Sequence, residues 1–197
     1  MQVFMKEEKT VFYPYSSWLK QRYGEKVYKL PVNLPVSCPN RCDGHGGCTF
    51  CSEKGTGFES VRQSASVTEQ MQHARDIVAK RYKARKFIAY FQNYTNTFMA
   101  MELFKAYLEE AAAFPDVVEI SISTRPDCIR TDYLACLAEL QERTHIGINI
   151  ELGLQTANYH TLDRVHRGHG LAEYIDAVLA IKRYPFTLCT HLIANLP

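Results

Sequence analysis

Helical and strand patterns alternate along most of this chain, and the alternation restricts the possible folds more than any other feature. Predicted strands lie at 29–37, 87–91, 117–123, 146–154 and 188–194, and the segment 87–91 is a continuous apolar run of the kind typical of buried strands. Segments with apolar residues at helical spacing lie at 67–86, 101–111, 131–140 and 171–184. Strands that alternate with helices pair in parallel through right-handed crossovers. The pattern therefore predicts an α/β fold, as either an open doubly wound sheet or a (βα) barrel.

Capping residues mark two of the expected helix starts. Ser66 and Glu69 have the spacing of a capping box, and Thr131 is expected to cap the helix that follows it. In both candidate architectures the functional residues lie at the C-terminal ends of the strands. The last apolar run ends close to Pro197 with no helix after it, so we expect a C-terminally truncated fold.

Composition and charge favour an ordinary cytoplasmic protein without a membrane anchor. The net charge is +2, and no apolar run approaches the ~20 residues that a membrane helix needs. The first ten residues carry charges instead of an apolar secretory segment. In a reducing compartment, closely spaced cysteines indicate metal binding or catalysis more often than a disulfide.

Four of the seven cysteines follow the first predicted strand closely, namely Cys38, Cys42, Cys48 and Cys51. Three glycines between the second and third of them allow the backbone to wrap around a compact group. The loop is compatible with a structural zinc site or with an iron–sulfur cluster on four thiolates. It is equally compatible with a cluster on three thiolates, which leaves one iron open to bind S-adenosylmethionine.

A series of motifs along the chain resembles one known family. The motifs are Tyr23–Val27, Cys38–Arg41, Gly46–Cys51, Tyr90–Gln92, Tyr94–Thr97, Ser123–Asp127, Glu151–Gln155 and Arg167–His169. They are similar to those of a radical SAM protein family that is itself similar to the radical-SAM domain of the Elongator catalytic subunit. The resemblance implies a partial (βα) barrel of which this chain holds about five of six βα units. Residues 1–28 would be an N-terminal extension, and 29–197 an incomplete radical SAM core domain.

The resemblance also implies which residues hold the two cofactors, a [4Fe–4S] cluster and S-adenosylmethionine. Cys38, Cys48 and Cys51 match the cluster ligands, whereas Cys42 departs from the family's pattern. Phe50 would pack against the adenine, or else anchor the loop in the core. The methionyl amino group would bind after the second strand, at Gln92, Thr95 and Asn96. Asn96 or Thr97 could instead cap the next helix.

Further cofactor contacts are expected from the next two strands. Ser123 and Arg125 would bind the methionyl carboxylate, unless Arg125 pairs with Asp127 instead. Glu151 and Gln155 share one strand face, and a carboxylate in an apolar strand needs a partner, which favours a contact with ribose or substrate. The remaining expected contacts are His169, which could otherwise lie in a simple turn, and, on the last strand, His191 or Asn195.

The activity that the resemblance implies is reductive cleavage of S-adenosylmethionine to a 5′-deoxyadenosyl radical. The implied partners are an electron donor such as flavodoxin or ferredoxin and a tRNA substrate modified at the wobble uridine. The alternative is a non-catalytic iron–sulfur or zinc protein with a four-cysteine structural or sensor site.

Overall fold

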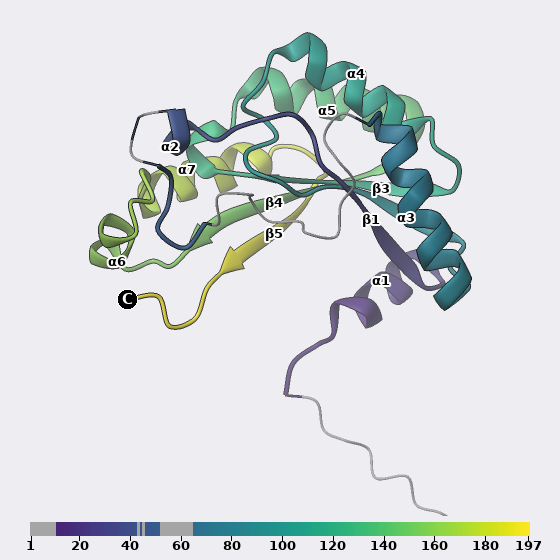
Figure 1. Cartoon of the computed structure of the whole chain (residues 1–197), viewed down its shortest axis with the longest axis horizontal. Coiled ribbons are helices and arrows are strands. Elements are labelled where there is room, and N and C mark those ends of the chain that lie inside the picture. The colour runs from purple at the N-terminus through teal and green to yellow at the C-terminus, as the bar shows by residue number, and fades with distance from the viewer. Residues whose placement is uncertain (1–10, 43, 45, 52–64) are drawn as a thin grey trace, which may run out of the picture.

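The computed structural model describes residues 11–42, 44, 46–51 and 65–197 (Figure 1). Its strands are β1 (Val27–Val32), β2 (Lys86–Phe91), β3 (Val117–Thr124), β4 (Gly147–Gln155) and β5 (Thr187–Leu192). Its helices are α1 (Tyr15–Tyr23), α2 (Pro39–Cys42), α3 (Val67–Tyr82), α4 (Met101–Ala112), the short 3-10 helix η1 (Pro126–Cys128), α5 (Thr131–Thr144), α6 (Tyr159–Arg164) and α7 (Leu171–Ile181). Within these residues, none of the helices combines the length and the apolar character needed to cross a membrane.

The five strands form one parallel sheet in the order β1-β2-β3-β4-β5. Each strand lies beside its predecessor in the chain, so right-handed crossovers place the connecting helices on the same face. A doubly wound sheet would instead reverse its strand order part-way and carry helices on both faces. The observed order therefore confirms an α/β fold of the partial (βα) barrel type.

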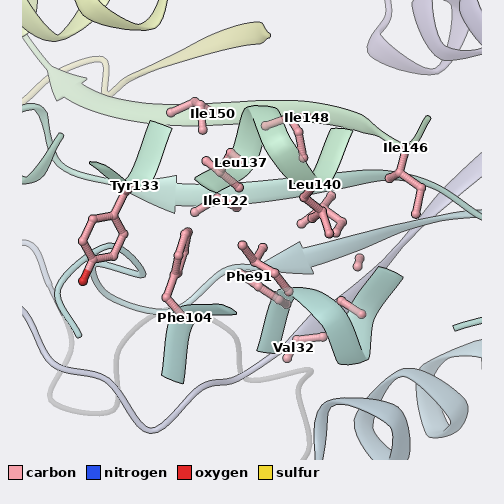
Figure 2. Close-up of a cluster of buried hydrophobic side chains, with 14 of the residues drawn as sticks. Val32, Phe91, Phe104, Ile122, Tyr133, Leu137, Leu140, Ile146, Ile148 and Ile150 are labelled. Atoms are coloured by element: carbon pink, nitrogen blue, oxygen red, sulfur yellow. The ribbon is translucent and has the colours of Figure 1, made fainter. Parts of the chain in front are cut away.

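The main hydrophobic core lies between the sheet and the helices on its outer face (Figure 2). Alternate strand residues such as Ile122 and Ile150 point toward Phe104 of α4 and Leu137 of α5, and all four are fully or almost fully buried. Burying a side chain of this size contributes roughly 1.5–3 kcal/mol relative to exposing it. Helical and strand periodicities thus meet in one layer, which determines the strand residues that face the helices.

Helix α1 packs on the opposite, inner face of the sheet (Figure 1). Leu19 of α1 forms a second small core with Val27 and Ile88, and Tyr23 packs against the edge of this core. The Tyr23 hydroxyl donates a hydrogen bond of 2.6 Å to Glu119 on β3. The boundary expected between residues 28 and 29 falls inside β1, and α1 is part of the same packed unit.

The elements differ from the expected ones in several places: α1, α2, η1 and α6 had no predicted counterpart, and α3 ends at Tyr82. The first strand ends at Val32 instead of Ser37, because the amide of Asn33 donates to the Gln70 side chain of α3 and leaves the ladder. The last strand ends at Leu192 instead of Ala194. Thr131 is the first helical residue of α5 and does not cap it, since Arg130 is the N-cap. The capping box at the start of α3 is confirmed by both of its hydrogen bonds.

Candidate functional site

Beyond the small core under α1, the inner face of the sheet is polar, in contrast to the apolar outer face. Buried residues on it include Glu119 and Ser121 of β3 and Asn149 and Glu151 of β4. These side chains alternate with the isoleucines of the core because successive strand residues point to opposite faces. Buried polar groups are costly unless they are hydrogen-bonded. The buried polar side chains of the inner face therefore need hydrogen-bond partners, from the protein or from a bound ligand.

A pocket of about 290 Å³ opens where this inner face meets the C-terminal ends of the strands. Its lining includes ten residues expected from the sequence: Cys38, Cys48, Phe50, Cys51, Gln92, Thr95, Ser123, Arg125, Glu151 and Gln155. They come from segments that are far apart in the chain, as expected for the carboxyl ends of parallel strands. Phe50 is 38% exposed, so it lies at the surface of the pocket and does not anchor the loop in the core.

The cysteine loop is held against the segment that follows α6. Buried Asn40 of α2 donates from Nδ2 to the carbonyl oxygens of His166 and Arg167 and to the sulfur of Cys48 at 3.3 Å. The amide of Thr49 donates to the carbonyl of Val165 at 3.1 Å. The bonds to Val165, His166 and Arg167 join residues more than a hundred positions apart in sequence and fix the loop beside the strand ends.

Cys42 lies apart from the other three cysteines of the loop. It is exposed, its sulfur is 3.8 Å from the Ser37 hydroxyl, and it does not line the pocket. In the described part of the chain, no three His, Cys, Asp or Glu side chains are grouped as ligands of a single metal ion.

Glu151 is the centre of a charged cluster on the floor of the pocket. Its Oε1 accepts hydrogen bonds from Lys29 and from Ser121, and its Oε2 lies 2.9 Å from His191 Nε2. Burial favours the neutral acid, but the contacts with His191 and Lys29 hold the pKa of Glu151 at about 2. Hydrogen bonds to Cys189 and Glu151 raise the pKa of His191 to about 9. Near neutral pH the cluster therefore contains a carboxylate between two cations.

Comparison with known proteins assigns this arrangement to a family. The model of the Radical SAM superfamily matches residues 33–197, which is most of the chain. The chain belongs to the radical SAM superfamily. The matched region contains the whole pocket lining and four of the five strands completely.

Several curated relatives are more than 30% identical to this chain over the aligned region. Uncharacterized protein YtqA of Bacillus subtilis is 38% identical over 182 residues, which are 91% of this chain and 56% of the relative. Protein YhcC of Escherichia coli is 37% identical over 181 residues, or 91% and 57%. Uncharacterized protein MJ0486 of Methanocaldococcus jannaschii is 31% identical over 188 residues, or 95% and 58%. The chain thus spans a little over half the length of these relatives.

Two residues expected to bind cofactor lie outside the pocket of this radical SAM core. Asn96 is fully buried and donates from Nδ2 to the carbonyls of Phe91 and Ser123, so it ties β2 to β3. His169 is also buried; burial and the Arg167 charge lower its pKa to about 4. Neither Asn96 nor Thr97 caps a helix, because α4 begins after Ala100.

Arg125 lines the pocket, but its guanidinium is largely engaged by Asp127. Two parallel hydrogen bonds of 2.9 and 2.7 Å join them, which is the pairing named as the alternative to a carboxylate clamp. The remaining nitrogen, Nη1, lies 3.7 Å from the sulfur of Cys38. The sequence signal for this pairing was Asp127, an acidic residue two positions after Arg125, which competes with the methionyl carboxylate for the guanidinium.

Sequence reasoning assigned no cofactor role to Arg41. It treated Arg167 only as part of the segment Arg167–His169, expected either to touch the cofactor or to form a turn. Both arginines line the radical SAM pocket. Both lie within motifs that carried the family resemblance. Their positions depend on contacts between distant segments, since Arg167 reaches Cys48 and the carbonyl of Gly153 on β4. His191, for which only an approach to the adenine or substrate was expected, also lines the pocket.

Proposed function

We propose that this chain is a radical SAM enzyme core in which Cys38, Cys48 and Cys51 hold a [4Fe–4S] cluster and the adjoining pocket binds S-adenosylmethionine. The observation that carries the proposal is that these three cysteines line one pocket with the polar ends of the strands, whereas Cys42 does not.

The polar residues of the pocket fit the second cofactor as well. Thr95 is almost completely buried, and its hydroxyl has no hydrogen-bond partner among the described residues. Leaving such a group unsatisfied costs about 1–3 kcal/mol, and a polar cofactor group in the pocket would remove this cost. Glu151 stays ionised over the whole physiological pH range and can accept hydrogen bonds from hydroxyl groups.

When bound, the cluster supplies an electron for reductive cleavage of S-adenosylmethionine, and the protein supplies binding, orientation and shielding from water. Thr95 and Gln92 would orient the methionyl group, and Glu151 with Gln155 would hold the ribose or the substrate. Phe50, at the open side of the pocket, would cover the adenine. His191 is protonated near neutral pH and so can donate, but not accept, a hydrogen bond at Nε2.

Cysteine replacement tests the proposal directly. Iron and sulfide content after anaerobic reconstitution should fall to near background for Cys38→Ala, Cys48→Ala and Cys51→Ala. The matched control is Cys42→Ala, which removes a thiol of the same loop and should keep the cluster. Equal loss of iron in all four variants would contradict the proposal and indicate a four-cysteine site. Zinc with no iron would indicate a structural metal site.

The substrate proposal is a tRNA modified at the wobble uridine, with flavodoxin or ferredoxin as the electron donor. It is based on the resemblance to the Elongator radical-SAM domain, and the relatives' names specify neither substrate nor donor. Nucleoside analysis of tRNA from cells that lack this protein tests it. A missing or precursor wobble nucleoside would support the tRNA substrate, and an unchanged nucleoside profile would contradict it.

A further inference from the structure

Each of the three cysteines in the pocket accepts a long hydrogen bond from a different arginine. The nitrogen–sulfur distances are 3.7 Å from Arg125 to Cys38, 3.6 Å from Arg167 to Cys48 and 3.7 Å from Arg41 to Cys51. The arginines come from three separate segments: the end of β3, the chain after α6, and α2. The fold thus supplies one guanidinium for each sulfur.

Arg167 has the environment that most clearly requires a negative partner. It is only 6% exposed, and no carboxylate forms an ion pair with it in the described part of the chain. Its Nη2 donates to the carbonyl of Gly153 at 2.6 Å, and its Nε has no partner there. A buried cation without a counter-charge is strongly unfavourable. As a cluster ligand, the sulfur of Cys48 would supply that counter-charge.

The other two arginines should act more weakly on the sulfurs, because their positive charges are neutralised or screened. Arg125 is also buried, but Asp127 neutralises most of its charge through the paired hydrogen bonds. Arg41 is partly exposed and lies over the Tyr94 ring, so solvent screens it more strongly. Arg167 should therefore have the largest electrostatic effect on anything that the three sulfurs bind.

We propose that Arg167 is a positioning residue that raises the reduction potential of a cluster held by Cys38, Cys48 and Cys51, with smaller contributions from Arg125 and Arg41. This inference rests on the function proposed above. Reduction adds one electron, supplied by a low-potential carrier such as a flavodoxin or ferredoxin, and so adds one negative charge. Nearby cations and N–H donors to the sulfurs stabilise the reduced form more than the oxidised form.

The test is an EPR-monitored redox titration of the reconstituted chain with Arg167→Met, Arg167→Lys and Arg164→Met. At a fixed potential, Arg167→Met should increase the ratio of oxidised to reduced cluster fivefold to tenfold. For a one-electron couple, a tenfold change in this ratio corresponds to 59 mV. The midpoint reduction potential of Arg167→Met should therefore be lower by about 40 to 59 mV. Arg167→Lys keeps the charge and should restore at least half of the shift.

Arg164→Met is the matched control, because Arg164 is exposed on the neighbouring helix α6 and does not line the pocket. Its midpoint should equal that of the unmodified chain. A normal cluster with an unchanged midpoint in Arg167→Met, or an equal shift in Arg164→Met, would overturn the inference. If Arg167→Met loses the cluster, Arg167→Gln, which removes the charge but keeps a hydrogen-bond donor, takes its place, and an unchanged midpoint potential there is equally contrary. No cluster in the unmodified chain would instead contradict the proposed function itself.

Discussion

Single side chains on the inner face of the sheet determine what the pocket can do. Glu151 is only 2% exposed, yet it remains ionised because Lys29 and His191 flank it. Lys29 is itself placed over the Tyr90 ring, 3.9 Å from the ring centroid. A buried carboxylate of this kind is destabilising without its cations and supplies a fixed negative charge with them.

The Glu151–His191 pair predicts a defined dependence of folding stability on pH. The pKa of Glu151 is lowered from 4.5 to about 2, so its contribution is complete above about pH 4.5 and is lost as the pH falls toward 2. The pKa of His191 is raised from 6.5 to about 9, so its contribution is complete below 6.5 and is lost as the pH rises to 9. Because His191 is partly exposed, we expect a loss of about 1–2 kcal/mol between pH 6.5 and 9.

Urea unfolding at a series of pH values measures this effect, with His191→Gln as the comparison. The variant should show a flatter free energy of unfolding between pH 6.5 and 9 than the unmodified chain. Parallel curves for the two proteins would show that His191 is not the titrating group.

Residue roles were predictable from the sequence where they depend on strand alternation, and not where they depend on long-range partners. Glu151 and Gln155 were placed correctly on one face that lines the pocket. The partners of Glu151, in contrast, come from β1, β3 and β5. The contact of Arg167 with Cys48 likewise joins residues 119 positions apart, and no local pattern encodes it.

Near the cysteines, α2 and the chain after α6 approach so closely that a side chain at Gly168 would clash with Asn40. Gly168 has a φ of +75°, and a Cβ there would lie 2.4 Å from the Asn40 side-chain oxygen. The same Asn40 anchors Cys48, so the glycine permits the close approach that places the loop.

Gly168→Ala should destabilise the fold more than a matched glycine replacement at Gly44. Gly44 has a φ of +77° but no atom within 4 Å of the added Cβ, so Gly44→Ala introduces backbone strain of about 1–2 kcal/mol and no clash. Gly168→Ala adds overpacking against Asn40, which typically costs about 1–3 kcal/mol more. Chemical denaturation of both variants measures the difference, and equal losses would show that Asn40 moves away without cost.

Helix α1 closes the inner face of the sheet at its N-terminal end, and one hydrogen bond tests its importance. Tyr23→Phe removes the donor to Glu119 and leaves a buried carboxyl group without it, which should lower the free energy of unfolding by about 1–3 kcal/mol. Tyr13→Phe, at an exposed tyrosine that bonds to Gln21, is the control and should change it by less than about 0.5 kcal/mol. Equal effects in thermal or urea unfolding would mean that α1 is only loosely attached.

Helix and strand types were read correctly from periodicity, whereas some ends were not. The apolar run 29–37 continues beyond β1, but after Val32 the backbone amide bonds to Gln70 of α3 instead of a neighbouring strand. The Asn33 amide thus bonds to a side chain from a distant helix, a contact that the local pattern does not encode.

Taken as a whole, the molecule is a five-stranded parallel sheet with a hydrophobic layer on one face and a polar pocket on the other. The sequence allowed either a doubly wound sheet or a barrel, since both alternate strands and helices. Strand order separates them, and it depends on which strands pair, which is a property of the complete fold. The family match agrees with the barrel type.

The most direct test of a cluster with an open iron is EPR of the anaerobically reconstituted and reduced chain, recorded with and without S-adenosylmethionine. We predict a [4Fe–4S]⁺ signal that shifts when S-adenosylmethionine is added, because three thiolates leave one iron free to bind it. A cluster signal that does not respond to S-adenosylmethionine would contradict the proposal that the pocket of this chain unites the two cofactors.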